Sequence, residues 1–207
     1  PKGSMIFKSR IYSDPSVDDS VEYNFVTLKT RPVNKTLIDL FDNADDDIRF
    51  GMLMNESRQT QKRPVACIRS AEMAFIIAEC YYHKNEKGKA LDMINQIRRN
   101  RFNTYTDLSE QDLPPVNIES VIRVDAKGNP LTPLIAFILN ERRKEFFLEG
   151  DRFYERKRNG CPQTWVSIKG WICTNYSYMY TLPIPYRETL LISGLKQNEG
   201  YTQVKPK

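Results

Sequence analysis

The sequence has few residues of the kinds that commit a protein to catalysis. Its 207 residues include one histidine, His83, and four cysteines with no Cys-x-x-Cys pair. His83 has no accompanying serine or cysteine pattern that would indicate nucleophilic catalysis. The cysteine spacing does not fit a zinc site, thioredoxin-like redox chemistry or haem attachment. No phosphate-binding run of the form GxxxxGK[ST] or GxGxxG occurs either. The sequence therefore predicts no enzyme active site, no cofactor and no metal site.

Long apolar runs and a strong charge of one sign are also missing. No stretch approaches the roughly 18 consecutive apolar residues that a membrane-spanning helix needs. A hydrophobic content of 40% excludes a wholly disordered chain. Lys and Arg number 31 against 26 Asp and Glu, but acidic residues are interspersed with the basic ones along most of the chain. Because this pattern offers no dedicated phosphate-binding face, we expect no nucleic-acid partner.

The four cysteines are interpreted as thiols without a ligand role. Cys67 and Cys80 lie in an apolar segment with helical periodicity, where buried thiols are common. Cys161 and Cys173 lie in a loop-like region, and an oxidising compartment would allow them to form a disulfide. Residues 1–4 read Pro-Lys-Gly-Ser, without an initiator Met or an apolar leader, so we expect a mature, truncated or engineered piece.

Apolar residues at three- and four-residue spacing predict a helical hairpin in the middle of the chain. The first helix is expected from Pro64 to Tyr82, and the second from about Lys89 to Arg101. The short break between them favours antiparallel packing. Small residues such as Ala71 allow the two axes to approach closely, as in tetratricopeptide-like hairpins. The fold class is therefore expected to be mainly α, with few short strands.

The other segments are expected to form an irregular start and a second helical block. Residues 1–63 are predicted to be largely extended or irregular, with one short helix near Thr36, and to wrap onto a helical domain over residues 64–207. A short strand or hairpin is expected over Ile118–Val124. Thr132 is a plausible N-cap for a helix that runs to Gly150. Further short helices are predicted over Asp151–Arg158 and Arg187–Leu191.

Two acidic clusters supply carboxylates, and both are interpreted as structural. The run Asp45–Asp47 lacks the glycine-spaced oxygen ligands of a calcium loop, so a solvated turn is favoured over a calcium site. Glu141, Glu145 and Glu149 lie at four-residue steps along one helix face. A glycosidase needs two carboxylates that face each other across a cleft, so ion pairs between helices are favoured over catalysis. The arginines considered as partners are Arg69, Arg142, Arg152 and Arg158.

The C-terminal segment is rich in aromatic residues, and it holds the candidate ligand-binding residues. Tyrosine and tryptophan rings offer an apolar face and a polar tip, which suits stacking on sugar rings. Tyr176, Tyr178 and Tyr180 alternate as on a strand, which for each of them favours packing over ligand contact. Trp165 and Trp171, among Gly and polar residues, are the better candidates. The predicted ligand-binding set is Trp165, Trp171, Tyr176 and Tyr178.

Three groups of motifs follow one another between residues 64 and 201. The first joins Ile68-Arg69-Ser70-Ala71-Glu72-Met73 to Ala90-Leu91 and Ile94-Asn95-Gln96-Ile97-Arg98. The second joins Asn140-Glu141-Arg142-Arg143-Lys144-Glu145-Phe146 to Glu149-Gly150-Asp151-Arg152, and the third joins Leu182-Pro183-Ile184-Pro185 to Gln197-Asn198-Glu199-Gly200-Tyr201. In this order they resemble the C-terminal portion of the SusD/RagB family of outer-membrane nutrient-binding lipoproteins of Bacteroidetes.

The resemblance implies a mainly helical, non-catalytic protein of the cell surface. Its role would be to bind glycan, or another oligomeric nutrient, and to deliver it to a SusC-like TonB-dependent transporter. The family's signal sequence, lipidated cysteine and most of its N-terminal half have no counterpart here, so no cysteine is assigned as the lipid anchor and no binding residue is transferred. The shared charged residues, such as Glu141 and Arg142, are implied to be ion-paired packing groups. The alternative is a helical protein–protein scaffold without a sugar site.

Overall fold

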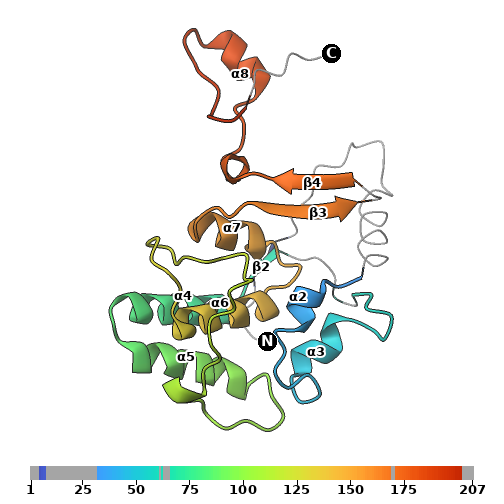
Figure 1. Cartoon of the computed structure of the whole chain (residues 1–207), viewed down its shortest axis with the longest axis vertical. Helices are drawn as coiled ribbons and strands as arrows, with labels where there is room; N and C mark the ends of the chain where they lie inside the picture. The colour runs from blue at the N-terminus through green and yellow to red at the C-terminus, as the bar shows by residue number, and fades with distance from the viewer. Residues whose placement is uncertain (1–4, 8–31, 61, 63–65, 169–170, 202–207) are drawn as a thin grey trace. The chain divides into compact units, whose positions relative to one another are not determined.

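The computed structural model describes residues 5–7, 32–60, 62, 66–168 and 171–201 (Figure 1). These residues fall into two units, and each is described by itself. The first unit comprises the described residues of Pro1–Val116 and Leu131–Arg152, and the second those of Asn117–Pro130 and Phe153–Lys207. Most of the regular structure is helical, so the predicted fold class is confirmed. Residues 8–31, within the predicted wrapping segment, lie outside the described residues, and that assignment stays a prediction.

The elements of the first unit are mostly helices, with one short pair of strands. In chain order they are β1 (Met5–Phe7), α2 (Lys35–Ile38), α3 (Ile48–Leu53), β2 (Ala66–Ile68), α4 (Ser70–His83), α5 (Lys87–Arg99), the 3-10 turn η1 (Glu110–Asp112) and α6 (Pro133–Glu145). The next helix, α7 (Asp151–Arg158), begins at the boundary between the two units.

Helices α4 and α5 form the predicted antiparallel hairpin (Figure 1). Ala78 of α4 and Ala90 of α5 are completely buried, as are Phe75 and Ile94. Two alanines at the contact leave room for the helix axes to lie close together, while the larger side chains fill the core beside them. The turn between the helices places Asn85 at a φ of 63°, a left-handed conformation that Asn adopts more readily than most residues.

The first helix of the hairpin begins later than predicted. Residues Ala66–Ile68 form strand β2, which pairs antiparallel with β1 so that Met5 lies opposite Ile68. Because this segment is extended in a ladder, α4 begins only at Ser70. Cys67 is therefore on a strand, and its side chain lies outside the described residues. Cys80 is exposed and carries a free thiol, so its predicted burial is wrong.

Helix α6 packs against both helices of the hairpin and is buried along most of its length. Thr132 is its N-cap and Pro133 its first residue, as predicted. The helix ends at Glu145 and does not reach Gly150. The following turn contains Leu148 at a φ of 61° and Gly150 at 83°, and left-handed backbone of this kind cannot continue a right-handed helix.

A small cluster of apolar side chains joins α2 and α3. Val33, Leu37, Phe41 and Leu53 are buried together, and the rings of Phe41 and Phe50 meet edge to face with centroids 5.2 Å apart. Asn34 caps α2 by accepting a hydrogen bond from Thr36 N, and Asp47 caps α3 by accepting one from Arg49 N. These caps allow two very short helices to form where hydrogen bonding within the helix alone is weak.

The described residues of the second unit form most of α7, a two-stranded ribbon and two further short helical pieces. The strands β3 (Thr164–Ile168) and β4 (Trp171–Asn175) pair antiparallel, and the 3-10 turn η2 (Ser177–Tyr180) and helix α8 (Tyr186–Leu191) follow. Helix α8 confirms the short helix expected there. Tyr180 is 2% exposed, packs on the ring of Phe153 and donates a hydrogen bond to the Pro162 carbonyl oxygen at 3.0 Å.

No strand forms over Ile118–Val124, so that prediction is wrong. This segment consists of turn and irregular backbone, with a single bridge between Val124 and Pro130. The Asp125 side chain accepts hydrogen bonds from the backbone N–H groups of Lys127 and Asn129, which closes a tight turn directly after the segment. Ile122 is buried at 3% exposure, but Ile118 is 83% and Val121 40% exposed, so the apolar residues of this segment do not line one face as in a strand packed on a core.

Candidate functional site

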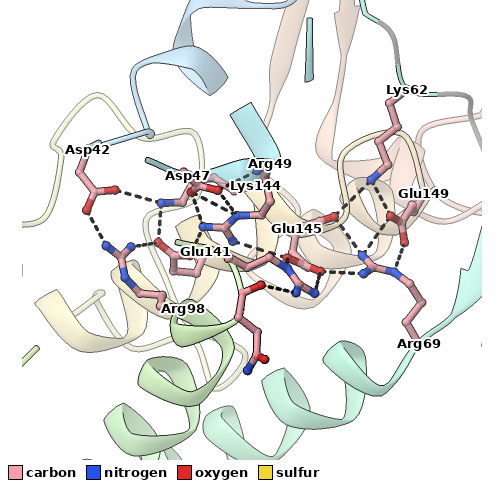
Figure 2. A network of polar contacts seen from close by, with 12 residues as sticks. Asp42, Asp47, Arg49, Lys62, Arg69, Arg98, Glu141, Lys144, Glu145 and Glu149 are labelled. Carbon is pink, nitrogen blue, oxygen red and sulfur yellow. Dashed lines mark hydrogen bonds and ion pairs between the residues drawn. The ribbon is translucent and has the colours of Figure 1, made fainter. Parts of the chain in front are cut away.

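Glu141 of α6 lies at the centre of a buried ion-pair network (Figure 2). Its side chain is fully buried, and it accepts hydrogen bonds from Arg49, at 2.9 Å, and from Arg98. Lys144 forms a third ion pair with the same carboxylate. The carboxylate of Asp47 accepts two hydrogen bonds from Arg49, at 2.9 Å from Nε and 2.6 Å from Nη2. Asp47 is 2% exposed, so the interpretation of this residue as part of a solvated turn is wrong.

The other two carboxylates of the predicted ridge continue the network along one line (Figure 2). Glu145 accepts hydrogen bonds from Arg69 Nη1 at 2.6 Å and from Arg101 Nη2 at 2.7 Å. Glu149, in the turn after the helix, accepts from Lys62 Nζ at 2.5 Å and from Arg69 Nε at 2.9 Å. Each of the three glutamates is therefore held by cations from segments distant in sequence.

The cations keep these carboxylates ionised in spite of their burial. Burial by itself would raise the pKa of Glu145, but hydrogen bonds and charge from Arg101, with the charges of Arg69 and Arg49, lower it to about 2. The pKa of Glu141 is likewise below its ordinary value, because burial is outweighed by Lys144, Arg49 and Arg98. A carboxylate held in this way cannot donate a proton at neutral pH, which is contrary to the needs of a general acid.

The predicted ion pairs between helices are confirmed for Arg69, and other partners were missed. Arg142 was expected in the network, and it pairs with Asp151, with Nη2 and Oδ1 2.5 Å apart. The resemblance implied that Arg98 is ion-paired, and it pairs with Glu141. The partners of the glutamates that were missed are Arg49, Lys62, Arg101 and Lys144. The helical pattern places Arg98 and Arg101 at the outer or C-terminal end of α5, and it carries no information about a carboxylate more than 40 residues away.

The aromatic ribbon, formed by β3 and β4, presents Trp165 to solvent. Trp165 is 69% exposed and lies opposite Thr174. Ile172 is 72% exposed and lies opposite Ser167, so by the alternation of an antiparallel pair it belongs to the same face as Trp165. Trp171 lies opposite Ile168, which puts position 171 in the other alternating set. Its side chain lies outside the described residues, and the assignment of Trp165 and Trp171 as ligand-binding residues stays a prediction.

The tyrosines form a separate aromatic cluster after the ribbon. The rings of Tyr176 and Tyr178 stack with centroids 5.8 Å apart and planes 6° from parallel, and Tyr201 meets Tyr178 edge to face at 5.0 Å. The three tyrosines do not alternate on a strand, because residues 177–180 form a 3-10 turn. Tyr176 is 46% exposed, whereas Tyr180 closes the core, as the packing interpretation expected.

No metal site or membrane span is found in the part of the chain that the structure describes. Within it, no three His, Cys, Asp or Glu side chains gather as a possible metal site. None of its helices has both the length and the apolar character to cross a bilayer. Cys161 and Cys173 are free thiols, so the structure contains no disulfide between them.

Comparison with known proteins gives one match. The family model of the SusD family matches residues 48–201, which is well over half of the chain. That range contains the three motif groups, the aromatic ribbon and the three glutamates of the ion-pair network. Searches of the curated proteins and of the solved structures gave no match.

Proposed function

The chain belongs to the SusD family, and from this premise we propose that it binds a glycan at the cell surface and delivers it to a SusC-like TonB-dependent transporter. Proteins of this family are non-catalytic binding proteins. They are lipoproteins of the outer-membrane surface, and their glycan binding is associated with SusC transporters. The particular glycan, the transporter and the surface location of this chain are the proposed parts.

The observation that carries the proposal is the exposure of Trp165 on the ribbon. A large indole ring that packs against no core retains its apolar face for a ligand, and sugar rings present matching C–H faces. The stacked pair of Tyr176 and Tyr178 offers a second aromatic surface in the same unit. These residues supply contact area and hydrogen-bonding tips but no acid–base pair, which agrees with binding without bond cleavage.

Affinity electrophoresis tests this role directly. The purified chain is run in native gels that each contain one soluble polysaccharide, and retardation in at least one gel is expected. Trp165→Ala should abolish that retardation. Tyr154→Ala is the matched control, because Tyr154 is a 65% exposed aromatic residue outside the predicted set. If Trp165→Ala migrates like the wild type in every retarding gel, Trp165 is not a ligand-binding residue.

The transporter partner needs a separate experiment. The outer membrane of the native organism is solubilised in mild detergent, the protein is pulled down, and the accompanying proteins are identified by mass spectrometry. A TonB-dependent barrel among them is the expected result. Recovery of the protein from the soluble cytoplasmic fraction without any barrel would contradict the delivery role.

One observation favours the alternative of a helical protein–protein scaffold. Met73, Ile76 and Ile77 lie at helical spacing on α4 and are 47%, 38% and 41% exposed. An apolar helix face of this kind can accept an amphipathic helix of a partner. This alternative predicts no retardation in any polysaccharide gel, together with a partner whose binding is lost in Ile77→Glu. Retardation that Ile77→Glu leaves unchanged would favour the glycan role.

A further inference from the structure

A cavity of about 490 Å³ lies within the first unit, beside the ion-pair network. Ile48, Met52 and Phe147 form an apolar part of its lining, and Lys62, Arg69 and Arg101 form a charged part. This volume lies within the range of about 300–1,000 Å³ that is usual for small-ligand pockets. We call it the cationic cavity, because the charged groups that solvent reaches in it are cations.

The charge that solvent can reach in this cavity is positive. The side chains of Lys62, Arg69 and Arg101 are 29%, 23% and 24% exposed, whereas those of Glu145 and Glu149 are 2% and 5% exposed. The carboxylates therefore lie behind the cations, although the two kinds of residue are paired. A ligand that enters the cavity meets ammonium and guanidinium groups first.

The same cations retain hydrogen-bond donors that the network does not use. A guanidinium has five N–H groups and an ammonium has three. Among the described residues, Arg101 makes three hydrogen bonds, Arg69 four and Lys62 two. Counted over the residues that the structure describes, two donors of Arg101 and one each of Arg69 and Lys62 make no hydrogen bond and are available to a ligand.

A buried arginine of the lining adds an independent observation. The side chain of Arg49 is only 6% exposed, and its Nη1 makes no hydrogen bond to any residue that the structure describes. The nearest carboxylate oxygen, Glu145 Oε2, is 3.5 Å from it. A buried donor without an acceptor is costly, and an anion close to this end of the network would lower that cost through its charge.

We propose that the cationic cavity binds an anionic sugar unit, whose carboxylate or sulfate group accepts hydrogen bonds from Lys62, Arg69 and Arg101. The apolar residues Ile48, Met52 and Phe147 would contact the face of the sugar ring. Charge-assisted hydrogen bonds to an oxyanion are stronger than those to neutral groups, so the anionic group would contribute most of the affinity. This inference rests on the proposed function, because it names the class of glycan that the protein binds.

The test compares ligands that share one sugar chain and differ in whether the carboxyl groups are ionised or methyl-esterified. Trigalacturonate and its fully methyl-esterified form are titrated into the full chain by isothermal calorimetry at low ionic strength. We expect the free acid to bind at least tenfold more tightly than the ester, because losing a hydrogen bond to a charged group typically weakens binding by that factor. A carrageenan tetrasaccharide, which carries sulfate esters and no carboxylate, shows whether sulfate is accepted as well. Raising the salt to 0.15 M should weaken binding, since the cations are partly exposed.

Variants locate the binding in the cavity. Lys62→Gln and Arg101→Gln are each expected to weaken trigalacturonate binding about tenfold, and Arg101→Lys, which keeps the charge, should recover part of the loss. Arg99→Gln is the matched control, because Arg99 is an exposed arginine paired with Asp107 and does not line the cavity. Lys62 is the most exposed of the three cations, so its variant reports on the ligand even if Arg101→Gln unfolds, which thermal melting detects.

The outcomes separate this inference from the proposed function. Equal affinity for acid and ester, or binding that Lys62→Gln and Arg101→Gln both leave unchanged, would overturn the cavity proposal while polysaccharide retardation through Trp165 still stands. Binding of hexaglutamate without binding of either anionic sugar would also overturn it, in favour of an acidic peptide. Trigalacturonate binding that Lys62→Gln and Arg101→Gln weaken, without retardation by any polysaccharide, would support the cavity proposal. The same result would count against polysaccharide binding as the role of the protein.

Discussion

The ion-pair network and the aromatic ribbon depart from the usual distribution of residues in opposite directions. In the network, charged side chains such as Glu141 are completely buried, whereas on the ribbon Trp165 is 69% exposed. Charged residues are almost never fully buried unless they are paired. Glu141 is paired with Arg49, Arg98 and Lys144. Among the residues that the structure describes, nothing covers Trp165 in a comparable way. A buried charge that is paired indicates a structural role. A large aromatic side chain that stays exposed indicates a surface for a partner or ligand.

The largest effect is expected when one carboxylate is removed from the centre of the network. Glu141→Gln leaves Arg49, Arg98 and Lys144 buried without their shared anion. Breaking a buried ion pair by removing one partner typically costs about 3–5 kcal/mol, and we expect a loss of that size in the free energy of unfolding. Urea denaturation followed by circular dichroism measures it. In the matched control Glu86→Gln, which removes an exposed pair with Lys89, the midpoint should not move; equal effects in the two variants would contradict the comparison.

Acid should weaken the network before it affects the ribbon. The pKa of Glu145 is about 2 in the folded protein, below its ordinary value of 4.5, so its contribution is complete above pH 4.5 and is lost as the pH falls towards 2. That shift corresponds to about 3 kcal/mol. The pKa of Asp42, also about 2, acts in the same direction. Urea titrations at pH 6 and pH 2.5 measure how much free energy of unfolding is lost on acidification. That loss should be smaller for Glu145→Gln than for the wild type, and equal losses would contradict a stabilising role of the Glu145 ion pairs.

A moderate effect is expected where the tyrosine cluster meets a glycine. Gly200 has a φ of 84°, and a Cβ atom at this position would overlap the ring of Tyr178. Gly200→Ala should therefore lower the free energy of unfolding by about 1–3 kcal/mol through backbone strain and should displace the stacked ring. Thermal melting measures the loss. Gly194→Ala is the control, because Gly194 has a similar φ of 82° and no atom within 4 Å of its added Cβ, so the difference between the variants isolates the clash with Tyr178.

The smallest effect on stability is expected at the ribbon itself. Trp165→Ala removes a side chain that is largely in water, so the free energy of unfolding should change by less than about 0.5 kcal/mol. The same variant is expected to lose glycan binding, which sharpens the contrast with Glu141→Gln. A loss of more than about 2 kcal/mol in the free energy of unfolding, measured by urea denaturation, would show that Trp165 packs against the protein. Trp165 would then not be a ligand-binding residue.

Local patterns predicted the helices well and the contacts between distant segments poorly. The hairpin α4–α5 follows from apolar spacing, and α6 from its N-cap, its Pro133 start and its apolar face. By contrast, the tyrosine alternation and the segment Ile118–Val124 suggested strands that do not form. Strand periodicity over so few residues also fits a 3-10 turn or an exposed loop, and only tertiary packing distinguishes them.

The candidate site shows the same division. Aromatic composition was sufficient to single out Trp165 and the pair Tyr176 and Tyr178, but their exposure and stacking depend on the register of the ribbon and the turn after it. The ridge of three glutamates was visible in the sequence, whereas the cationic cavity was not. Its exposed cations come from Lys62, Arg69 and Arg101, which no local pattern connects.

The sequence by itself determined the helical class, the placement of Glu141 and Glu145 on α6, the aromatic C-terminal segment and the resemblance that the family match confirms. These features depend on residue order within a few turns of helix or on motifs in series. Tertiary structure alone decided that Arg49 reaches Glu141 across 92 residues, and that the carboxylates lie behind the cations at the cavity. Pairing energy between charges depends on their distance and burial in space, and neither is encoded in local spacing.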